Sequence, residues 1–592
     1  MIRTPLRPLA RILSARAKGE NPDAIMRENL RLRHEQIRDS ARTRAEGRLL
    51  VLGVMFFAAF AVVGVRMGTL AASEPSEPRA AASGTAIVAQ RADITDRNGN
   101  ILATNLATHS LYAQPPIMVD PTRAAHELAA IFPDLDEARL VKDFTGKRKF
   151  LWIRKKISPE QMQQVHDIGD PGLMFGPREM RLYPNGHLAA HVLGGAGFGR
   201  EGVQSAEVIG VAGVEKTFDG WLRDPAQGGA PLRLSLDLTV QAAVERVLAG
   251  GMKLMNAKGA AAVLMQVDTG EVVAMVSLPD FDPNDRPTPL TRGDASDSPL
   301  FNRAVQGVYE LGSTFKTFAL AQALDLGLAN PATMIDTQGP LKWGKYRIHD
   351  FHDYGRQLSV TDVLVKSSNI GTARIAMQIG AERQRAFLTS LGLLEPTPLE
   401  LLEAAGGKPL IPSNWSEIST MTISYGHGLS ASPMHLAAAY ATIANGGYRV
   451  RPTLMAGGGQ RGERVVSAET SRAMRSMLRQ VVSRGTASFG DVPGYAVGGK
   501  TGTADKPKPT GGYYDDKVIA TFASVFPTDD PEYVLVVTLD EPEDITGPEP
   551  RRTAGWTAVP VAAEIIRRAA PLLGLRPEIE QSAGFGVTLT SN

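Results

Sequence analysis

Hydrophobic and polar residues follow changing periods along this chain, and each change predicts an element of structure. The first long apolar run covers residues 49–65 and contains no charged residue, which predicts a transmembrane helix. At about 1.5 Å per residue the run spans about 25 Å, slightly less than a hydrocarbon core of about 30 Å. The predicted membrane anchor therefore extends to residue 72.

Beyond the anchor the pattern predicts a linker, two folded regions and a tail. Residues 73–85 are rich in Pro, Ser and Ala, as linkers are. Residues 86–230 have mixed patterns and no obvious catalytic set, whereas residues 231–575 carry clear element signals. These signals are a helix at 237–248, a hairpin at 260–276, strands at 518–526 and 533–539, and a helix at 559–573. Residues 576–592 predict a flexible tail.

Early strands, a helical middle and late strands together predict an α/β fold in which a sheet lies between helices. At 592 residues the chain is long enough for more than one domain. The absence of cysteine excludes disulfides, a thiol nucleophile and a cysteine-ligated metal. The formal net charge of +2 gives no sign of nucleic-acid binding.

Charge is unevenly distributed around the predicted anchor. Residues 1–48 carry 12 Lys/Arg and 6 Asp/Glu, a net charge of +6, and the remaining 52 basic and 56 acidic residues give −4. The positive-inside rule therefore predicts a single-pass inner-membrane protein with a cytoplasmic basic segment and a periplasmic folded part. A cleaved signal peptide is the alternative, and the long flank before the apolar run argues against it.

The first candidate for chemistry is Ser313-Thr-Phe-Lys316. Ser313 precedes a helix-forming run that ends at Asp325, so it is expected in the first turn, near free N–H groups. Lys316 follows one turn later on the same face. A serine hydroxyl attacks only when a base accepts its proton, and lysine can do so if burial or nearby cations depress its pKa. The alternative is a serine helix cap beside an exposed lysine.

Ser367-Ser368-Asn369 is the second candidate and lies between two predicted helical runs. In that position the side chains can point into a cleft. Ser367 is then able to relay a proton between the nucleophile, the lysine and the leaving amine. Asn369 offers a donor and an acceptor to a substrate amide. A helix cap is again the alternative, because Ser and Asn are favoured there.

The third candidate is Lys500-Thr501-Gly502-Thr503, at the end of a predicted strand covering residues 495–499. Glycine in a strand admits a close backbone approach, and the strand can pair with an extended peptide. Lys500 and Thr501 are expected to bind a substrate carboxylate. The main-chain N–H groups of Ser313 and Thr503 are expected to form an oxyanion hole, worth about 3–4 kcal/mol per donor at comparable sites.

Two other patterns compete for a functional interpretation. Residues 494–501 match the phosphate-binding G-x-x-x-x-G-K-[ST] loop, but the Pro- and Gly-rich continuation at 503–512 forbids the helix that this loop requires. His349-Asp350-Phe-His352-Asp353 has metal-ligand residue types without the spacing of a metal site, which favours loop packing. The sequence therefore predicts no metal and no cofactor.

Further motifs extend the three candidates into a family resemblance. Residues 86–575 resemble the class B penicillin-binding proteins, in which a catalytic domain of the penicillin-binding, serine-transpeptidase fold follows a mixed α+β pedestal. The resemblance is carried by Asp93-Ile-Thr-Asp-Arg97-Asn-Gly99, Arg181-Leu-Tyr-Pro184-Asn-Gly186, Gly210-Val-Ala-Gly213-Val-Glu215, Leu311-Gly-Ser-Thr-Phe-Lys316, and Ser424-Tyr-Gly-His-Gly428 with Ala439-Tyr-Ala-Thr-Ile-Ala-Asn-Gly446.

The resemblance implies a peptidoglycan D,D-transpeptidase of the cell-division (septal) branch. Ser313 would attack the D-Ala–D-Ala bond of a stem peptide and release D-alanine, with Lys316, Ser367, Asn369 and Lys500 completing the catalytic set. Thr501, Gly502 and Thr503 would hold the substrate. The implied partners are amine acceptors, β-lactams, the membrane, a glycan-polymerising glycosyltransferase and other division proteins.

Three alternatives remain open from the sequence. The chain could be an elongation-type class B transpeptidase. It could be a D,D-carboxypeptidase or β-lactamase-like hydrolase, which passes the acyl group to water, although the anchor and pedestal argue against this. It could also be a division scaffold with a vestigial site.

Overall fold

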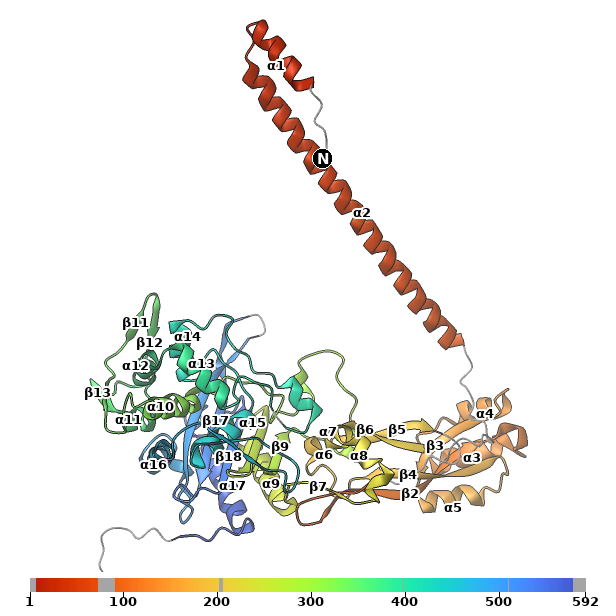
Figure 1. The fold of residues 1–592 in the computed structure, drawn as a ribbon. Helices are drawn as coiled ribbons and strands as arrows, with labels where there is room; N and C mark the ends of the chain where they lie inside the picture. The colour runs from red at the N-terminus through yellow and green to blue at the C-terminus, as the bar shows by residue number, and fades with distance from the viewer. Residues whose placement is uncertain (1–6, 73–90, 202–205, 398, 509–510, 579–592) are drawn as a thin grey trace, which may run out of the picture. The chain divides into compact units, whose positions relative to one another are not determined.

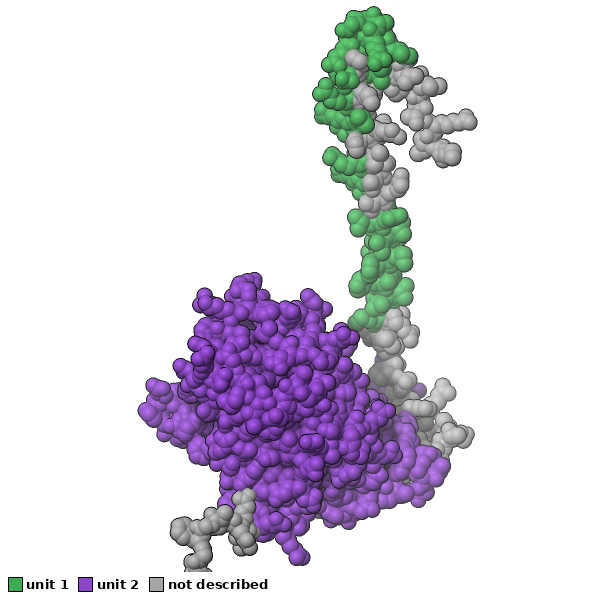
Figure 2. Space-filling view, turned by 60° about the vertical axis from the view of Figure 1, so that its left-hand side comes forward, with its two compact units in different colours: residues 1–78 green, residues 79–592 purple. Residues whose placement is uncertain are grey.

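The computed structural model describes residues 7–72, 91–201, 206–397, 399–508 and 511–578. Its internal contacts divide the chain into two compact units, residues 1–78 and residues 79–592 (Figure 2). The predicted linker at 73–85 and most of the predicted tail at 576–592 lie outside the described residues. The predicted boundary near residue 230 falls inside the second unit and stays a prediction.

The first unit is helical where it is described. It consists of α1 (Arg7–Ala17) and one long helix, α2 (Pro22–Ala72), in which ion pairs such as Arg31–Glu35 are spaced four residues apart (Figure 1). Residues Glu46–Val65 of α2 are long and apolar enough to cross a membrane. The predicted helix at 49–72 is confirmed, but it begins earlier, at Pro22 within the basic segment.

The sheet that contains the third candidate pattern has five antiparallel strands in the order β16-β17-β18-β8-β9 (Figure 1). Their bounds are β8 (Gly259–Gln266), β9 (Val272–Leu278), β16 (Gly498–Pro507), β17 (Tyr513–Phe526) and β18 (Tyr533–Asp540). The predicted hairpin and the two late strands are confirmed. Strand β16 lies at one edge of the sheet, and it contains the third candidate pattern.

The predicted strand at 495–499 was placed too early. The structure begins β16 at Gly498 and carries it through Lys500 and Thr503 to Pro507. The reason lies in its partner, because β17 offers a long apolar run that pairs with β16 from Gly498 opposite Val525 to Asp505 opposite Val518. The glycines and lysines of β16 have little strand propensity of their own, so the extension is set by the neighbouring strand.

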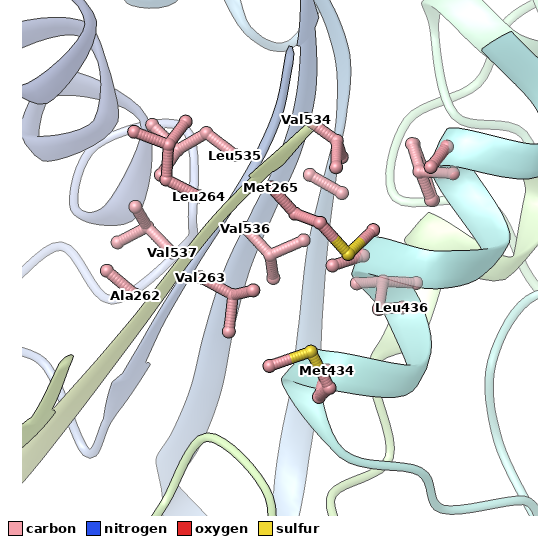
Figure 3. Close-up of a cluster of buried hydrophobic side chains, with 14 of the residues drawn as sticks. Ala262, Val263, Leu264, Met265, Met434, Leu436, Val534, Leu535, Val536 and Val537 are labelled. Carbon is pink, nitrogen blue, oxygen red and sulfur yellow. The ribbon is translucent and has the colours of Figure 1, made fainter. Parts of the chain in front are cut away.

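Helices cover both faces of this sheet. Figure 3 shows the alternation of its central strands: Val263, Met265 and Val536 face Met434 and Leu436 of α15 (Pro433–Ala444). Ala262, Leu264, Leu535 and Val537 point to the opposite side, where α9 (Leu238–Leu254) and α17 (Ala558–Leu572) pack against the strands. All of these side chains are buried. The predicted α/β fold with a sheet between helices is confirmed, and so are its first and last helices.

Four short elements carry the first two candidate patterns. They are the 3₁₀ turn η5 (Gly312–Phe315), α10 (Lys316–Asp325), α11 (Val360–Val365) and α12 (Asn369–Ile379). Further helices surround them: α13 (Ala381–Ser390), α14 (Glu417–Ser424) and α16 (Ala468–Arg484). Short strands complete the region: β10 (Met334–Asp336), β11 (Leu341–Trp343), β12 (Tyr346–Ile348), β13 (Gln357–Ser359), β14 (Tyr448–Val450) and β15 (Arg461–Arg464).

The predicted mixed α+β part lies before residue 231, although one strand of its sheet, β7 (Leu232–Arg233), follows that position. This sheet joins β1 (Ile94–Thr95), β2 (Ile101–Ala113), β3 (Leu151–Ile157), β4 (Leu173–Leu182) and β7, and a hairpin joins β5 (Gly195–Glu201) to β6 (Ala206–Ala212). Its helices are α3 (Pro121–Ile131), α4 (Glu137–Thr145), α5 (Pro159–Asp167), α6 (Ala190–Leu193), α7 (Gly213–Thr217) and α8 (Asp219–Leu222). A separate apolar core packs beneath α3, α4 and α5.

A buried ionic cluster gives the motifs of this region a structural role. The Glu215 carboxylate accepts hydrogen bonds from Arg91 Nε and Arg181 Nε, both at 2.6 Å, and all three side chains are buried. Burial, reinforced by the Glu215 charge, raises the pKa of Tyr183 well above its usual value. Removing one member of such a cluster leaves a buried charge unpaired, so the cluster fixes how these segments meet.

A second ionic cluster links residues far apart in sequence. His187 Nδ1 lies 2.8 Å from Glu245 Oε1 on α9 and 3.0 Å from Asp280 Oδ2. Partial burial lowers the pKa of His187, but the two carboxylates outweigh this and raise it above its usual value. Burial and the charge of Asp280 raise the pKa of Glu245. The imidazolium therefore compensates two neighbouring carboxylates.

We expect His187→Gln to remove a pH-dependent part of the stability. A histidine whose pKa is raised by folding stabilises the protein below its unfolded pKa of about 6.5, and this contribution is lost as pH rises through the raised value. The unfolding temperature of the wild type should exceed that of the variant at about pH 6 and approach it by about pH 8–9. Thermal unfolding of detergent-solubilised protein measures this, with exposed His166→Gln on α5 as control. A difference that is constant with pH would contradict the expectation.

Candidate active site

The serine of the first pattern lies in a tight turn instead of a regular helix. Ser313 is half-buried in the 3₁₀ turn η5. The sequence predicted that Ser313 would lie in the first turn of the helix, but α10 begins only at Lys316. Gly312 has a φ of +55°, and a Cβ there would lie 2.6 Å from the Thr503 carbonyl oxygen and 3.0 Å from its nitrogen. The turn is therefore packed closely against β16.

Lys316 is fully buried, which excludes the alternative of a serine cap beside an exposed lysine. Its Nζ donates to the Ser367 carbonyl oxygen at 2.5 Å, to Ser367 Oγ at 3.0 Å and to Asn369 Oδ1 at 2.7 Å. The first two patterns, which lie about 50 residues apart in sequence, are thus joined directly by hydrogen bonds.

Ser367 connects the second pattern to the third. Lys500 is also fully buried, and its Nζ donates to Ser367 Oγ at 3.0 Å and to the Thr501 carbonyl oxygen at 3.0 Å. One hydroxyl oxygen therefore contacts two lysine side chains. Ser367 has a φ of +64°, a conformation that costs a non-glycine residue on the order of 1–3 kcal/mol and is concentrated at functional sites.

The buried lysines have weakened affinities for protons. Burial holds the pKa of Lys316 well below its usual value, and the nearby Lys500 lowers it further, whereas the Asp350 charge raises it. Burial lowers the pKa of Lys500 to about 7. Desolvation disfavours the charged form of an amine, and two adjacent ammonium groups repel each other. A lysine in its neutral form is able to accept a proton from a hydroxyl group.

The third pattern lies on β16 beside the serine turn. Thr501 Oγ1 lies 2.8 Å from Thr486 Oγ1, and Thr503 Oγ1 accepts a hydrogen bond from the Ala554 nitrogen at 3.0 Å. A Cβ on Gly502 would lie 2.1 Å from the Leu311 carbonyl oxygen. The close approach at Gly502 is thus made by the chain's own backbone, and the approach of a substrate there stays a prediction.

The phosphate-loop alternative is excluded by the same strand. After Lys500 the chain continues as β16 to Pro507 and returns as β17, without the helix that would receive a phosphate. The segment that matched the loop motif is therefore part of a sheet.

Asp350 belongs to this site, although its motif was interpreted as loop packing. Its Oδ2 accepts from Ser368 Oγ at 2.7 Å, and its Oδ1 accepts from the nitrogens of Asn369 at 2.5 Å and Ile370 at 3.0 Å. The sequence signal that could have identified Asp350 was its place in a His/Asp cluster shortly before the second pattern. Among the described residues, the side chains of metal-ligand type that lie close enough together to share an ion are not in this motif. They are His187, Glu245 and Asp280.

Glu310 is a second residue that sequence reasoning missed. It is buried three residues before Ser313 and accepts hydrogen bonds from the Gly428 nitrogen at 2.8 Å and from Tyr513 Oη at 3.1 Å. It thereby ties the serine turn to the tip of the β16–β17 hairpin. Its signal was only its place next to the first pattern.

Known families match both parts of the second unit. Residues 260–567 match the family described as "Penicillin binding protein transpeptidase domain", and residues 86–228 match the "Penicillin-binding Protein dimerisation domain". Proteins of the transpeptidase family act on peptidoglycan stem peptides and bind β-lactams.

Individual relatives agree with these matches. The chain is 36% identical over 93% of its length to the probable peptidoglycan D,D-transpeptidase FtsI of Caulobacter vibrioides, of which 93% is covered. It is 30% identical to the FtsI of Escherichia coli, over 76% of this chain and 79% of that protein. A solved structure of penicillin-binding protein 3 from Mycobacterium tuberculosis, complexed with ampicillin, is 27% identical with a TM-score of 0.63, over 84% of this chain and 98% of that chain.

The chain therefore belongs to the class B penicillin-binding proteins, serine enzymes that combine a dimerisation domain with a transpeptidase domain. Within that class it is an FtsI-like peptidoglycan D,D-transpeptidase.

Proposed function

We propose that Ser313 is the nucleophile that cross-links peptidoglycan stem peptides during septal wall synthesis. Its Oγ attacks the D-Ala–D-Ala bond, an acyl-enzyme forms, and the terminal D-alanine leaves. An amine of a neighbouring stem peptide then attacks the acyl carbon, and Ser313 is released with its proton restored. The observation that carries the proposal is the pair of buried lysines that share Ser367 Oγ beside the serine turn.

Each predicted residue has a separate role in this proposal. Lys316 in its neutral form accepts the proton of Ser313, and Ser367 relays it to the leaving amine through hydrogen bonds to Lys316 and Lys500. Asn369 orients Lys316 through its Oδ1 and offers its amide to the substrate. Burial lowers the pKa of both lysines, that of Lys500 to about 7, which favours proton exchange with the neighbouring hydroxyl groups.

Substrate binding is proposed for the edge of the sheet that β16 forms. An extended stem peptide pairs with this edge strand, and Lys500 and Thr501 bind its terminal carboxylate. The N–H groups of Ser313 and Thr503 stabilise the oxyanion, a role supported by the contact between Gly312 and Thr503. Gly502 keeps β16 close to the serine turn, which brings these donors together.

The proposed domain organisation and membrane orientation follow the sequence pattern. Residues 1–48 form a cytoplasmic basic segment, 49–72 the anchor, 73–85 a linker, 86–230 a non-catalytic pedestal, 231–575 the periplasmic transpeptidase domain and 576–592 a tail. The positive-inside rule supports this orientation in the inner membrane. The relatives named FtsI favour a septal role over elongation, with a glycan-polymerising glycosyltransferase and other division proteins as partners.

The lifetime of the penicillin adduct tests transpeptidation against hydrolysis. We expect a fluorescent penicillin to label the full-length protein with one equivalent and to remain bound through denaturing electrophoresis. We also expect that, when D-alanine is released from a stem peptide, a supplied D-amino acid is joined through its amine to that stem peptide. Rapid turnover of the penicillin, with D-alanine release but no amine incorporation, would favour the carboxypeptidase or β-lactamase alternative.

A further inference from the structure

Asp350 lies outside the three patterns but binds the second of them through its carboxylate. Its two carboxylate oxygens accept three hydrogen bonds, from the Ser368 hydroxyl and from the backbone nitrogens of Asn369 and Ile370, over 2.5–3.0 Å. These donors form the beginning of α12. The carboxylate thus holds the end of the helix on which Asn369 is the first residue.

A simple helix cap does not account for these contacts. Ser368 already caps α12, because its Oγ accepts from the Gly371 nitrogen at 2.9 Å. Asp350 binds the cap itself and two further nitrogens, and it lies 18 residues upstream in a different segment. The additional carboxylate therefore fixes where the capped helix end lies relative to that segment.

The same segment also fixes the side chain of Asn369. The His349 carbonyl oxygen, next to Asp350, accepts a hydrogen bond from Asn369 Nδ2 at 3.0 Å. Since the amide nitrogen is engaged there, the amide oxygen Oδ1 is turned toward Lys316 Nζ, which it contacts at 2.7 Å. Asn369 therefore presents an acceptor to the lysine, and the 349–350 backbone keeps it from flipping.

Asp350 also sets the electrostatic surroundings of Lys316. Two influences lower the pKa of this lysine, its burial and the charge of Lys500 on β16, and the Asp350 carboxylate opposes them. The oxygens of Ser367 and Asn369 that accept hydrogen bonds from Lys316 Nζ are neutral. Asp350 itself adjoins Tyr354, whose pKa is raised by burial and by the Asp350 charge.

We infer that Asp350 is a positioning residue for acylation, which orients Asn369 toward Lys316 and supplies a negative charge near Lys316. The inference rests on the proposed role of Lys316 as proton acceptor. Asp350 contacts the helix end through hydrogen bonds to Ser368, Asn369 and Ile370, so it acts through Asn369 and Lys316.

The pH dependence of acylation by penicillin separates this role from a structural one. Acylation requires neutral Lys316, so its rate falls at low pH with a midpoint that reports the lysine pair. In Asp350→Asn the lysine loses its anionic neighbour and its pKa falls, so the midpoint should move to lower pH. The plateau rate should fall on the order of 10- to 100-fold, because the amide is no longer held in place.

Asp350→Glu separates charge from position. The longer carboxylate keeps the negative charge and displaces the helix end, so the midpoint should stay near that of the wild type while the plateau rate falls. If Asp350→Asn fails to fold, this variant carries the test, and a wild-type plateau in it overturns the inference. Asp237→Asn is the matched control, since Asp237 caps α9 through the nitrogens of Thr239 and Val240. It should leave the pH profile unchanged.

The outcomes distinguish this inference from the proposed function. An Asp350→Asn protein with the wild-type midpoint and plateau overturns the positioning role, and so does one with only a lower unfolding temperature. Ser313→Ala in the same assay tests the proposed nucleophile. If that variant is still labelled, the proposed function is wrong; if it is unlabelled while Asp350→Asn behaves as wild type, only the present inference falls.

Discussion

The Ser313→Ala protein is expected to fold normally and to remain unlabelled by a fluorescent penicillin. The substitution removes the atom that is proposed to form the acyl bond, so the loss of labelling should be complete within detection. The side chain is half-buried in a turn held by Gly312 and β16, so the fold does not depend on the hydroxyl. Gel fluorescence and thermal unfolding measure the two quantities on the same full-length sample.

Ser483→Ala provides the control, because Ser483 is exposed on α16. That variant should label like the wild type. Stoichiometric labelling of Ser313→Ala would mean that another residue is the nucleophile. In cells that lack the native copy, Ser313→Ala should also fail to support septal cross-linking. Normal septa in that strain would favour the non-catalytic scaffold.

The sheet and its covering helices could be predicted because their signals are local. Strands β17 and β18 are runs of β-branched and aromatic residues, and the α9 and α17 segments have apolar stripes of helical period. The extent of β16 could not be predicted in this way. Its strand conformation comes from pairing with β17, which is a tertiary effect that overrides weak local propensity.

The composition of the site was predictable, but its geometry was only partly so. The three patterns named Ser313, Lys316, Ser367, Asn369 and Lys500, and the structure brings the last four into direct hydrogen-bond contact. Their roles in catalysis remain proposals. The 3₁₀ turn at Ser313 depends on a close approach of Gly312 to β16, more than 180 residues later in the chain, and no local pattern reports such a contact.

Asp350 shows why the sequence can fail to reveal that a residue of a conspicuous motif belongs to the site. Viewed in sequence, its His and Asp neighbours suggested either a metal site or a loop, and nothing linked them to the second pattern. The link is a set of hydrogen bonds to the start of α12, which forms only once the chain has folded. Sequence spacing gives no information on which helix end a distant carboxylate will meet.

Replacing Lys316 with methionine tests the proposed proton acceptor. Methionine keeps much of the buried apolar volume and removes the amine. Because general-base catalysis typically contributes 10²–10⁴-fold, the acylation rate constant should fall by about that factor. The wild-type rate should decline as pH falls through a midpoint well below the usual lysine value of about 10.4, since burial and Lys500 lower the pKa of Lys316.

In Lys316→Met this decline with falling pH should disappear, because the group that must be neutral is absent. A time course of labelling with fluorescent penicillin, quenched at fixed times and repeated at several pH values, measures both the rate and its pH dependence. Lys366→Met is the matched control: Lys366 is exposed, directly precedes Ser367, and should leave rate and profile within about twofold of the wild type. If Lys316→Met keeps the wild-type decline with falling pH, Lys316 is not the proton acceptor, and the base must be sought elsewhere in the lysine pair, with Lys500 as the remaining candidate.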